Sequence, residues 1–251
     1  MTTAHNTGTM SSAEHQKQLD EFQRRMREAA GDDLEALVLY GSAAGGDYQA
    51  GHSDLNLLCL LKRTDAACLS RLAPVVRWWR AQGQPDPWLF TLDELQQSAD
   101  VFAIELLDIQ RRHTVLFGPD HFQSLVVPMT LHRLQVEREL RVNLIKLRQS
   151  YLSAEGGRKD LLHLMTDSLS TFVTLFRHAL IACGEQPAPH KRGVVEQAAA
   201  LFGFEAGAVT AVLDLREGHR KPPDAAETQA LFGSYLNAVD RVTAEVDRRL
   251  A

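Results

Sequence analysis

The sequence predicts an N-terminal α/β domain followed by an all-helical domain. Two short apolar segments, 34–41 and 54–63, are bounded by turn residues and are typical of buried strands. Beyond about residue 127, apolar residues recur at spacings of three and four, which is the helical pattern. We therefore expect three segments along the chain: a disordered tail over 1–12, an α/β domain over 13–127 and a helical bundle over 128–251.

One helix precedes the first strand and another follows the second. Residues 14–33 place four apolar side chains at spacings of three and four, so they form one helical stripe. A second helix is expected over 64–82, with Thr64 or Asp65 as its N-cap and Gly83 as its stop. The two strands are therefore flanked by helices in the chain.

A short strand, a helix and an ambiguous segment complete the first domain. DPWLFT, residues 86–91, is typical of a short strand bounded by turn residues. Thr91 and Glu94 have the spacing of a capping box, which predicts that a helix begins there. The segment DIQRRHTVLFGPD, residues 108–120, is ambiguous, and we favour a strand that ends at the turn beginning with Gly118.

The second domain is predicted to be a series of amphipathic helices. The two longest, over 129–152 and 159–184, carry apolar residues at offsets of three or four on single faces. Three further helices, separated by breaks that contain Gly or Pro, are expected over 191–202, 205–215 and 224–250.

Composition indicates an ordinary globular protein. Hydrophobic residues make up 45% of the 251 residues, and the net charge of -5 gives no general attraction to nucleic acid or to an anionic membrane. The three cysteines, Cys59, Cys68 and Cys183, are widely spaced and lack a CxxC pair, which favours reduced core thiols. Because we find no signal peptide and no apolar run of the roughly 20 residues that span a bilayer, we expect a cytoplasmic protein without a membrane partner.

The segment between the first two strands carries the candidate functional motif. A P-loop would need Lys and then Ser or Thr where this chain has Asp47 and Tyr48, so that motif is excluded. No G-x-G-x-x-G follows either strand, so a Rossmann dinucleotide site is unsupported. The pattern that remains is an apolar strand, Gly41-Ser42, a Gly-rich connection and then Ser-Asp-Leu-Asn, residues 53–56, leading into the next apolar strand.

This arrangement resembles the nucleotidyltransferase superfamily, which includes DNA polymerase β and the aminoglycoside nucleotidyltransferases. The resemblance is specific over residues 36–61, and the order of an α/β domain and then a helical domain is similar to the aminoglycoside-modifying branch. It implies a mixed sheet, Mg²⁺ as cofactor and a nucleoside triphosphate (NTP) as substrate or ligand. The implied reaction is transfer of a nucleoside monophosphate to a hydroxyl group on a small molecule or a protein.

The resemblance assigns a phosphate-binding loop and a metal site. Glycine lets the backbone approach a triphosphate closely, and backbone amides and a serine hydroxyl donate to its oxygens. Residues two apart on a strand point to the same face, about 6.6 Å apart, so Asp54 and Asn56 are expected to face one cleft and to hold metal. The phosphate-binding residues are Gly41, Ser42, Gly46 and Ser53.

Asn56 departs from the family pattern, which has a second carboxylate at this position. An Asn carbonyl can ligate Mg²⁺, but it brings no charge and one oxygen instead of two. We expect the loss to cost about 3 kcal/mol, or roughly a hundredfold in rate. The family's third carboxylate is also irregular, because DPWLFT offers only Asp86 at its entry. Glu105 is the preferred candidate for third ligand or base, and Asp108 is the other.

Two functions stay open at this point. The first is a Mg²⁺-dependent nucleotidyltransferase of reduced activity. The second is a catalytically lapsed nucleotide-binding or regulatory module, in which the helical domain presents the nucleotide state to a partner such as another copy of the chain. Asn56 is the residue that separates them, because efficient two-metal catalysis requires the charge that it lacks.

Other polar and aromatic residues have simpler interpretations. Arg111, Arg112 and His113 could face a triphosphate, as could the arginines of 133–148, but interspersed glutamates favour a solvated, salt-bridged helix face for the latter. At least one residue of Trp78-Trp79 is expected in the core rather than stacked on a base. Arg158 and His163 have the R-x4-H spacing of a ribonuclease motif, which we attribute to chance.

Overall fold

The computed structural model describes residues 12–44, 54–154 and 157–250. The chain divides into two compact units, Met1–Pro128 and Met129–Ala251, which we call the N-terminal and C-terminal units. Two of the predicted phosphate-binding residues, Gly46 and Ser53, lie outside the described residues, as does the predicted N-terminal tail over most of its length.

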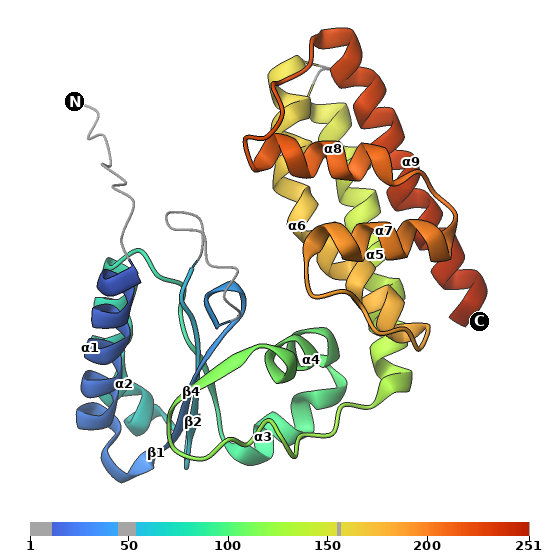
Figure 1. Cartoon of the computed structure of the whole chain (residues 1–251). Helices are drawn as coiled ribbons and strands as arrows, with labels where there is room; N and C mark the ends of the chain where they lie inside the picture. The colour runs from blue at the N-terminus through green and yellow to red at the C-terminus, as the bar shows by residue number, and fades with distance from the viewer. Residues whose placement is uncertain (1–11, 45–53, 155–156, 251) are drawn as a thin grey trace, which may run out of the picture. The chain divides into compact units, whose positions relative to one another are not determined.

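In its described residues, the N-terminal unit contains four strands and the helices that cover them (Figure 1). Its strands are β1 (Leu34–Tyr40), β2 (Asn56–Leu61), β3 (Trp88–Phe90) and β4 (His113–Phe117). Its α-helices are α1 (Ser12–Ala30), α2 (Ala66–Ala81), α3 (Leu92–Gln97) and α4 (Ala103–Arg111). Short 3-10 turns lie at η1 (Gly31–Asp33), η2 (Ser42–Ala44) and η3 (Ser98–Asp100).

The strands form one mixed sheet in the order β3-β2-β1-β4. β1 is antiparallel to both β2 and β4, whereas β3 is parallel to β2. Alternate residues of the central strands point to opposite faces, so Leu37 and Leu57 pack with α1 and α2, while Val38 and Leu58 pack with α3 and α4. Figure 1 shows these two helical layers on either side of the sheet.

Local capping signals set the helix boundaries in this unit. The Asp65 side chain accepts a hydrogen bond from the Cys68 N–H at 2.8 Å and caps α2, as one of the two predicted candidates. The predicted capping box of α3 is confirmed, because Thr91 accepts from the Glu94 N–H at 3.1 Å and Glu94 accepts from the Thr91 N–H at 2.7 Å. Gly83 follows the end of α2 with a positive φ of 81°.

The segment 108–120 is only partly a strand, so our prediction for it was wrong in its first half. Residues up to Arg111 belong to α4, and β4 begins at His113. The reason lies in the apolar spacing upstream, where Ala103, Leu106 and Ile109 recur every three residues and are all buried against the sheet. The period of three outweighs the strand pattern of the residues that follow.

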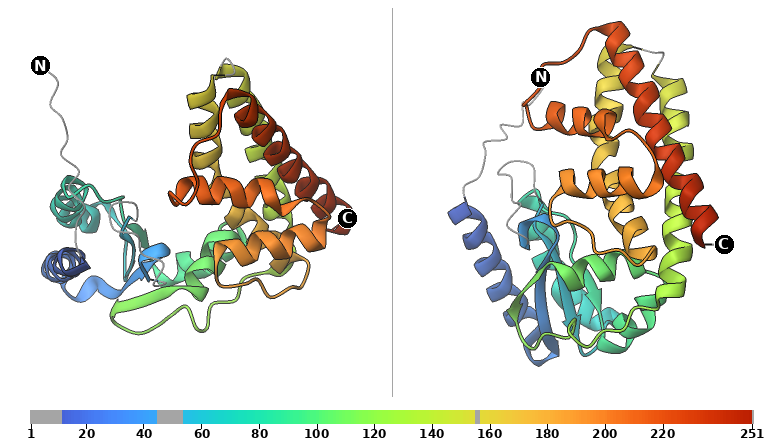
Figure 2. Two further views of the ribbon diagram at one scale, coloured as in Figure 1. Left: turned by 45° about the horizontal axis from the view of Figure 1, so that its top comes forward. Right: turned by 45° about the vertical axis from the view of Figure 1, so that its right-hand side comes forward.

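The C-terminal unit is entirely helical where the structure describes it. Three long helices run side by side, and two shorter ones lie across them in the views of Figures 1 and 2. The helices are α5 (Met129–Ser153), α6 (Arg158–Ala182), α7 (Lys191–Phe202), α8 (Ala206–Arg216) and α9 (Ala225–Leu250). The predicted fold class, a mixed-sheet domain followed by an all-α domain, is confirmed.

Two of the three cysteines lie in the core, as the composition favours. Cys59 and Cys68 are buried free thiols, and Cys183 is a half-buried one. Burial raises the pKa of the Cys59 thiol well above its ordinary value. Among the described helices, none combines the length and apolar character needed to cross a membrane.

Candidate functional site

The two halves of the sequence motif meet at one end of the sheet. Tyr40, the last residue of β1, pairs across the ladder with Asn56, the first residue of β2. Gly41 follows with a φ of 82°, and a Cβ built on it would lie 3.3 Å from Nδ2 of Asn56. The Asn56 amide therefore packs directly against the Gly41 backbone, and glycine suits this position for both its conformation and its lack of a side chain.

Ser42 begins the turn that leaves the sheet after Gly41. It opens η2, and the Ala44 N–H donates to the Gly41 carbonyl at 3.2 Å to close the turn. Ser42 is exposed, so its hydroxyl is accessible to a ligand. The loop that follows, which contains Gly46 and Ser53, lies outside the described residues.

Asp54 precedes β2 rather than lying on it, which corrects the expectation that Asp54 and Asn56 share one strand. The ladder ends at the Tyr40–Asn56 pair because β1 turns away at Gly41. The backbone just before β2 is held by a side chain instead, since the Leu55 N–H donates to Oε1 of Gln84 at 2.9 Å. Asp54 is exposed, and the alternation of a strand does not fix its direction.

Glu105 lies in the first turn of α4, so the candidate third acid comes from a helix and not from a later strand. Burial raises the pKa of Tyr40 to about 12, and the negative charge of Glu105 contributes to this rise. The half-buried Glu105 carboxylate therefore lies near enough to Tyr40 to act on its phenol. Tyr40 is therefore a neutral phenol near neutral pH. Asn56 shares the sheet face of Leu58, which α4 covers, so Asn56, Tyr40 and Glu105 are brought to one face of the sheet.

The alternative third acid on the strand side is already engaged. Asp86, just before β3, accepts from Nε of Arg80 at 3.0 Å and from Nη2 at 2.5 Å. This pair holds the pKa of Asp86 below its usual value. Asp86 is thus a surface ion-pair partner, while Asp108 is half-buried one helical turn after Glu105.

An aromatic cluster beside this site was not predicted. The Trp88 ring centroid lies 6.1 Å from that of Tyr40, 5.7 Å from that of Phe90 and 5.4 Å from that of Phe102. Phe102 is 36% exposed, and the other three rings are half-buried. The alternating Trp88-x-Phe90 pattern on a short strand was a signal, because residues two apart point to the same face.

Several of the remaining basic and aromatic candidates have structural partners. Trp79 is buried, as expected for one of the pair, and the Arg25 guanidinium lies 4.5 Å from the centroid of the Trp78 ring. The predicted salt-bridged face of α5 is confirmed by pairs such as Arg141–Glu137 at 3.0 Å. Arg158 of the R-x4-H pattern donates to the Pro223 carbonyl at 2.6 Å.

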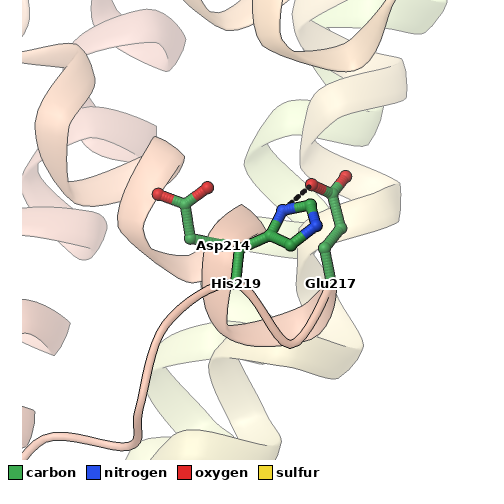
Figure 3. Close-up of side chains that lie close together, drawn as sticks. All are labelled: Asp214, Glu217 and His219. Atoms are coloured by element: carbon green, nitrogen blue, oxygen red, sulfur yellow. Dashed lines mark ion pairs between the residues drawn. The ribbon is translucent and has the colours of Figure 1, made fainter.

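One cluster in the C-terminal unit has the composition of a metal site. Asp214, Glu217 and His219 gather at the end of α8, and Nδ1 of His219 lies 3.4 Å from a carboxylate oxygen of Glu217 (Figure 3). However, Asp214 already accepts from Nη2 of Arg192 at 2.5 Å. Because a guanidinium neutralises the most enclosed of the three, the cluster is explained as a surface ion-pair group.

Comparison with known proteins yields likeness in structure but none in sequence. Neither the family models nor the curated proteins give a match to this sequence. Among solved structures, the chain is similar to spectinomycin adenyltransferase AAD(9) from Enterococcus faecialis, whose crystal structure contains ATP and spectinomycin. The identity is 11% and the TM-score 0.44, over 90% of this chain and 99% of that chain. ATP and spectinomycin are ligands of that protein.

Proposed function

We propose that the N-terminal unit binds an NTP where β1 and β2 end, and slowly transfers its nucleoside monophosphate to a hydroxyl acceptor on a small molecule or a protein. The observation that supports this most directly is the packing of the Asn56 amide against Gly41, with Glu105 near Tyr40 on the same sheet face. Gly41 and Asn56, which belong to the two halves of the motif, are thus in contact at the end of the β1–β2 ladder.

The phosphate subsite would be formed by the turn after β1. The positive φ of Gly41 shapes the turn that presents Ser42, whose exposed hydroxyl can donate to a phosphate oxygen. The Asn56 amide, with its Nδ2 toward Gly41, offers further donors at the same place. By the family pattern, Gly46 and Ser53 would complete the loop.

The donor set fits one Mg²⁺ ion better than two. Asp54 would supply a carboxylate and Asn56 an amide oxygen, and Mg²⁺ is usually anchored by one or two carboxylates together with substrate phosphates. When bound with the triphosphate, Mg²⁺ would neutralise charge that develops on the transferring phosphoryl group. With one charge fewer than the family pattern, we expect the rate to be lower by roughly a hundredfold.

Glu105 would act as the base. The acceptor oxygen bonds to the α-phosphorus, the bond from that phosphorus to the pyrophosphate oxygen breaks, and the hydroxyl proton passes to the Glu105 carboxylate. Tyr40, a neutral phenol near this carboxylate, can donate a hydrogen bond to a ligand oxygen. The half-buried Trp88 ring and the exposed Phe102 ring offer an apolar wall beside these groups for a flat part of a ligand.

Asn56 favours a second candidate function, a nucleotide-binding module that has lost turnover. In this case the same residues bind the triphosphate, but the missing carboxylate leaves the transferring group without sufficient charge stabilisation. The helical C-terminal unit would then communicate the bound state to a partner, for example a second copy of the chain. Both candidates require nucleotide binding, and they differ in turnover.

The deciding experiment incubates the purified chain with labelled NTPs and Mg²⁺ or Mn²⁺, and compares wild type with Asn56→Asp and Asp54→Ala. Wild-type turnover that disappears in Asp54→Ala supports the enzyme. Turnover that appears only in Asn56→Asp supports the lapsed module. Asp86→Asn is a matched control, because Asp86 is paired with Arg80 and should leave any turnover unchanged. Both candidates are wrong if calorimetry detects no nucleotide binding by any variant.

A further inference from the structure

His113 has an acceptor at each of its two ring nitrogens. Its Nδ1 lies 2.8 Å from the carbonyl oxygen of Ile109, in the last turn of α4, and its Nε2 lies 3.1 Å from Oδ1 of Asp120. The side chains of His113 and Asp120 are 12% and 23% exposed, so water has limited access to either contact. The protonation of this ring follows from what the two oxygens can do.

Both oxygens act as acceptors. The Ile109 oxygen belongs to a peptide carbonyl, which has no proton to give. Asp120 also accepts from the Phe122 N–H at 3.0 Å and from Nε2 of Gln123 at 2.9 Å, so its two oxygens are occupied as those of an ionised carboxylate. Burial raises the pKa of this carboxyl group, yet the hydrogen bonds with His113, Gln123 and the Phe122 N–H hold it below the usual range.

A neutral imidazole has one donor and one acceptor nitrogen. Either neutral tautomer of His113 would therefore turn a lone pair toward an oxygen lone pair at one of the two contacts. We infer that His113 is an imidazolium cation in the folded chain and that, with Asp120, it is a positioning pair for α4. The carboxyl end of α4 adds to this preference, because the last carbonyls of a helix favour a nearby positive charge.

The pair joins three elements around the candidate site. It ties the last turn of α4 to the start of β4 and to the loop after β4, and Gln110 reinforces the tie by donating to the carbonyls of Phe122 and Leu125 at 2.9 and 2.7 Å. The same helix carries Glu105 in its first turn. The role for Glu105 rests on the proposed function, whereas the charge of His113 does not.

Other titratable or charged groups approach this ring from the elements packed around it. Tyr40 of β1 is the cross-strand neighbour of His113, and its phenol is neutral near neutral pH. Arg112 precedes His113 at the end of α4, and His121 follows Asp120 in the loop. Asp120 is the anion in hydrogen-bond contact with the ring, so it is the group whose removal should change the protonation of His113.

Nuclear magnetic resonance of the full chain tests the charge directly, without any nucleotide. Histidine nitrogens are isotope-labelled, and the His113 signals are assigned from their loss in His113→Gln or from contacts with the Phe122 ring, whose centroid lies 5.3 Å away. We expect both nitrogens to carry protons at neutral pH, while the exposed His163 serves as a reference. A neutral tautomer at His113 would overturn the inference.

Asp120→Asn tests the positioning role. We expect the His113 ring to become neutral in this variant and the amides of α4 to exchange with solvent about tenfold faster, because a charge-assisted hydrogen bond is lost. Asp214→Asn, which removes a surface ion pair of the C-terminal unit, should change neither. If His113 stays doubly protonated and α4 exchange is unchanged in Asp120→Asn, the pair has no positioning role. The protonation of His113 and the exchange of the α4 amides are both measured without nucleotide, so they test the pair even if the chain binds no nucleotide.

Discussion

Gly41 combines two demands that an ordinary residue cannot meet together. Its φ of 82° lies in the left-handed region, and a Cβ there would lie only 3.3 Å from the Asn56 amide nitrogen, so that side chain would have to shift slightly. Gly83 has nearly the same φ, 81°, but nothing lies within 4 Å of a Cβ built there. The two glycines therefore allow backbone strain and crowding at the site to be measured separately.

We expect Gly41→Ala to destabilise the chain more than Gly83→Ala does. Both variants pay the conformational cost of a positive φ, about 1 kcal/mol, but only Gly41→Ala also displaces the Asn56 amide. Denaturant unfolding measures the free energies, and calorimetry with an NTP measures binding. Binding should weaken in Gly41→Ala and stay at the wild-type value in Gly83→Ala. Equal nucleotide binding by the two variants would show that Gly41 does not contribute to the phosphate subsite.

At the scale of single elements, α3 depends on its capping box. The Thr91 side chain accepts from the Glu94 N–H, one of the donors that the helix leaves without an internal partner. Thr91→Ala should therefore lower the free energy of unfolding by about 1 kcal/mol. Thr130→Ala, an exposed threonine in the first turn of α5, is the comparison. A cost for Thr91→Ala no larger than that for Thr130→Ala would contradict the capping role.

Helix α1 has an acid-sensitive ion pair. Hydrogen bonds from Arg24 and Arg25 lower the pKa of Glu21 from 4.5 to about 2. Because the folded pKa is the lower one, the stabilising contribution of Glu21 is complete above the unfolded value and is lost as the pH falls toward 2. The stability difference between wild type and Glu21→Gln should therefore shrink across this range.

Unfolding curves recorded at several pH values test this dependence. Asp20→Asn is the control on the same helix, because Asp20 accepts from the neutral amide of Gln16 rather than from an arginine. A difference between wild type and Glu21→Gln that stays constant from about pH 5 to pH 2 would show that the ion pair does not contribute. Added salt should also reduce the difference, because the pair is exposed and screened.

At the scale of the whole molecule, each unit has a core of its own. In the C-terminal unit, Phe172, Phe176 and Tyr235 are fully buried, and the Phe172 and Tyr235 ring centroids lie 6.1 Å apart. We expect the isolated segment 129–251 to fold without the N-terminal unit, with a helical circular dichroism spectrum and a cooperative thermal transition. A gradual, non-cooperative loss of signal would show that this unit needs the rest of the chain.

Phe176→Ala in the isolated segment provides the matched test of its core. Removing a fully buried ring should cost about 3–5 kcal/mol, which is a large part of the stability of a single domain. The transition should shift to a clearly lower temperature or vanish. A transition unchanged by Phe176→Ala would mean that the helices of the segment are not held by the core that buries this ring.

The sequence alone predicted the order of the elements and the fold class. Helical stripes, apolar strands and the caps at Asp65 and Thr91 are local signals, because they depend on residues within one or two turns of each other. The same reasoning located the motif at the join of the first two strands, where Gly41 and Asn56 pack together. It failed at 108–111, where a helix and a strand meet without a turn residue between them.

Only the tertiary structure decided which groups share a face. Glu105 comes to Tyr40 because α4 packs on that side of the sheet, and Asp86 is engaged because Arg80 of α2 reaches it. The acceptors around His113 come from a helix and a loop on either side of its strand. Local patterns carry no information about such contacts, because the long-range packing of the sheet and helices determines which side chains meet. The electrostatic surroundings of each titratable group follow from that packing.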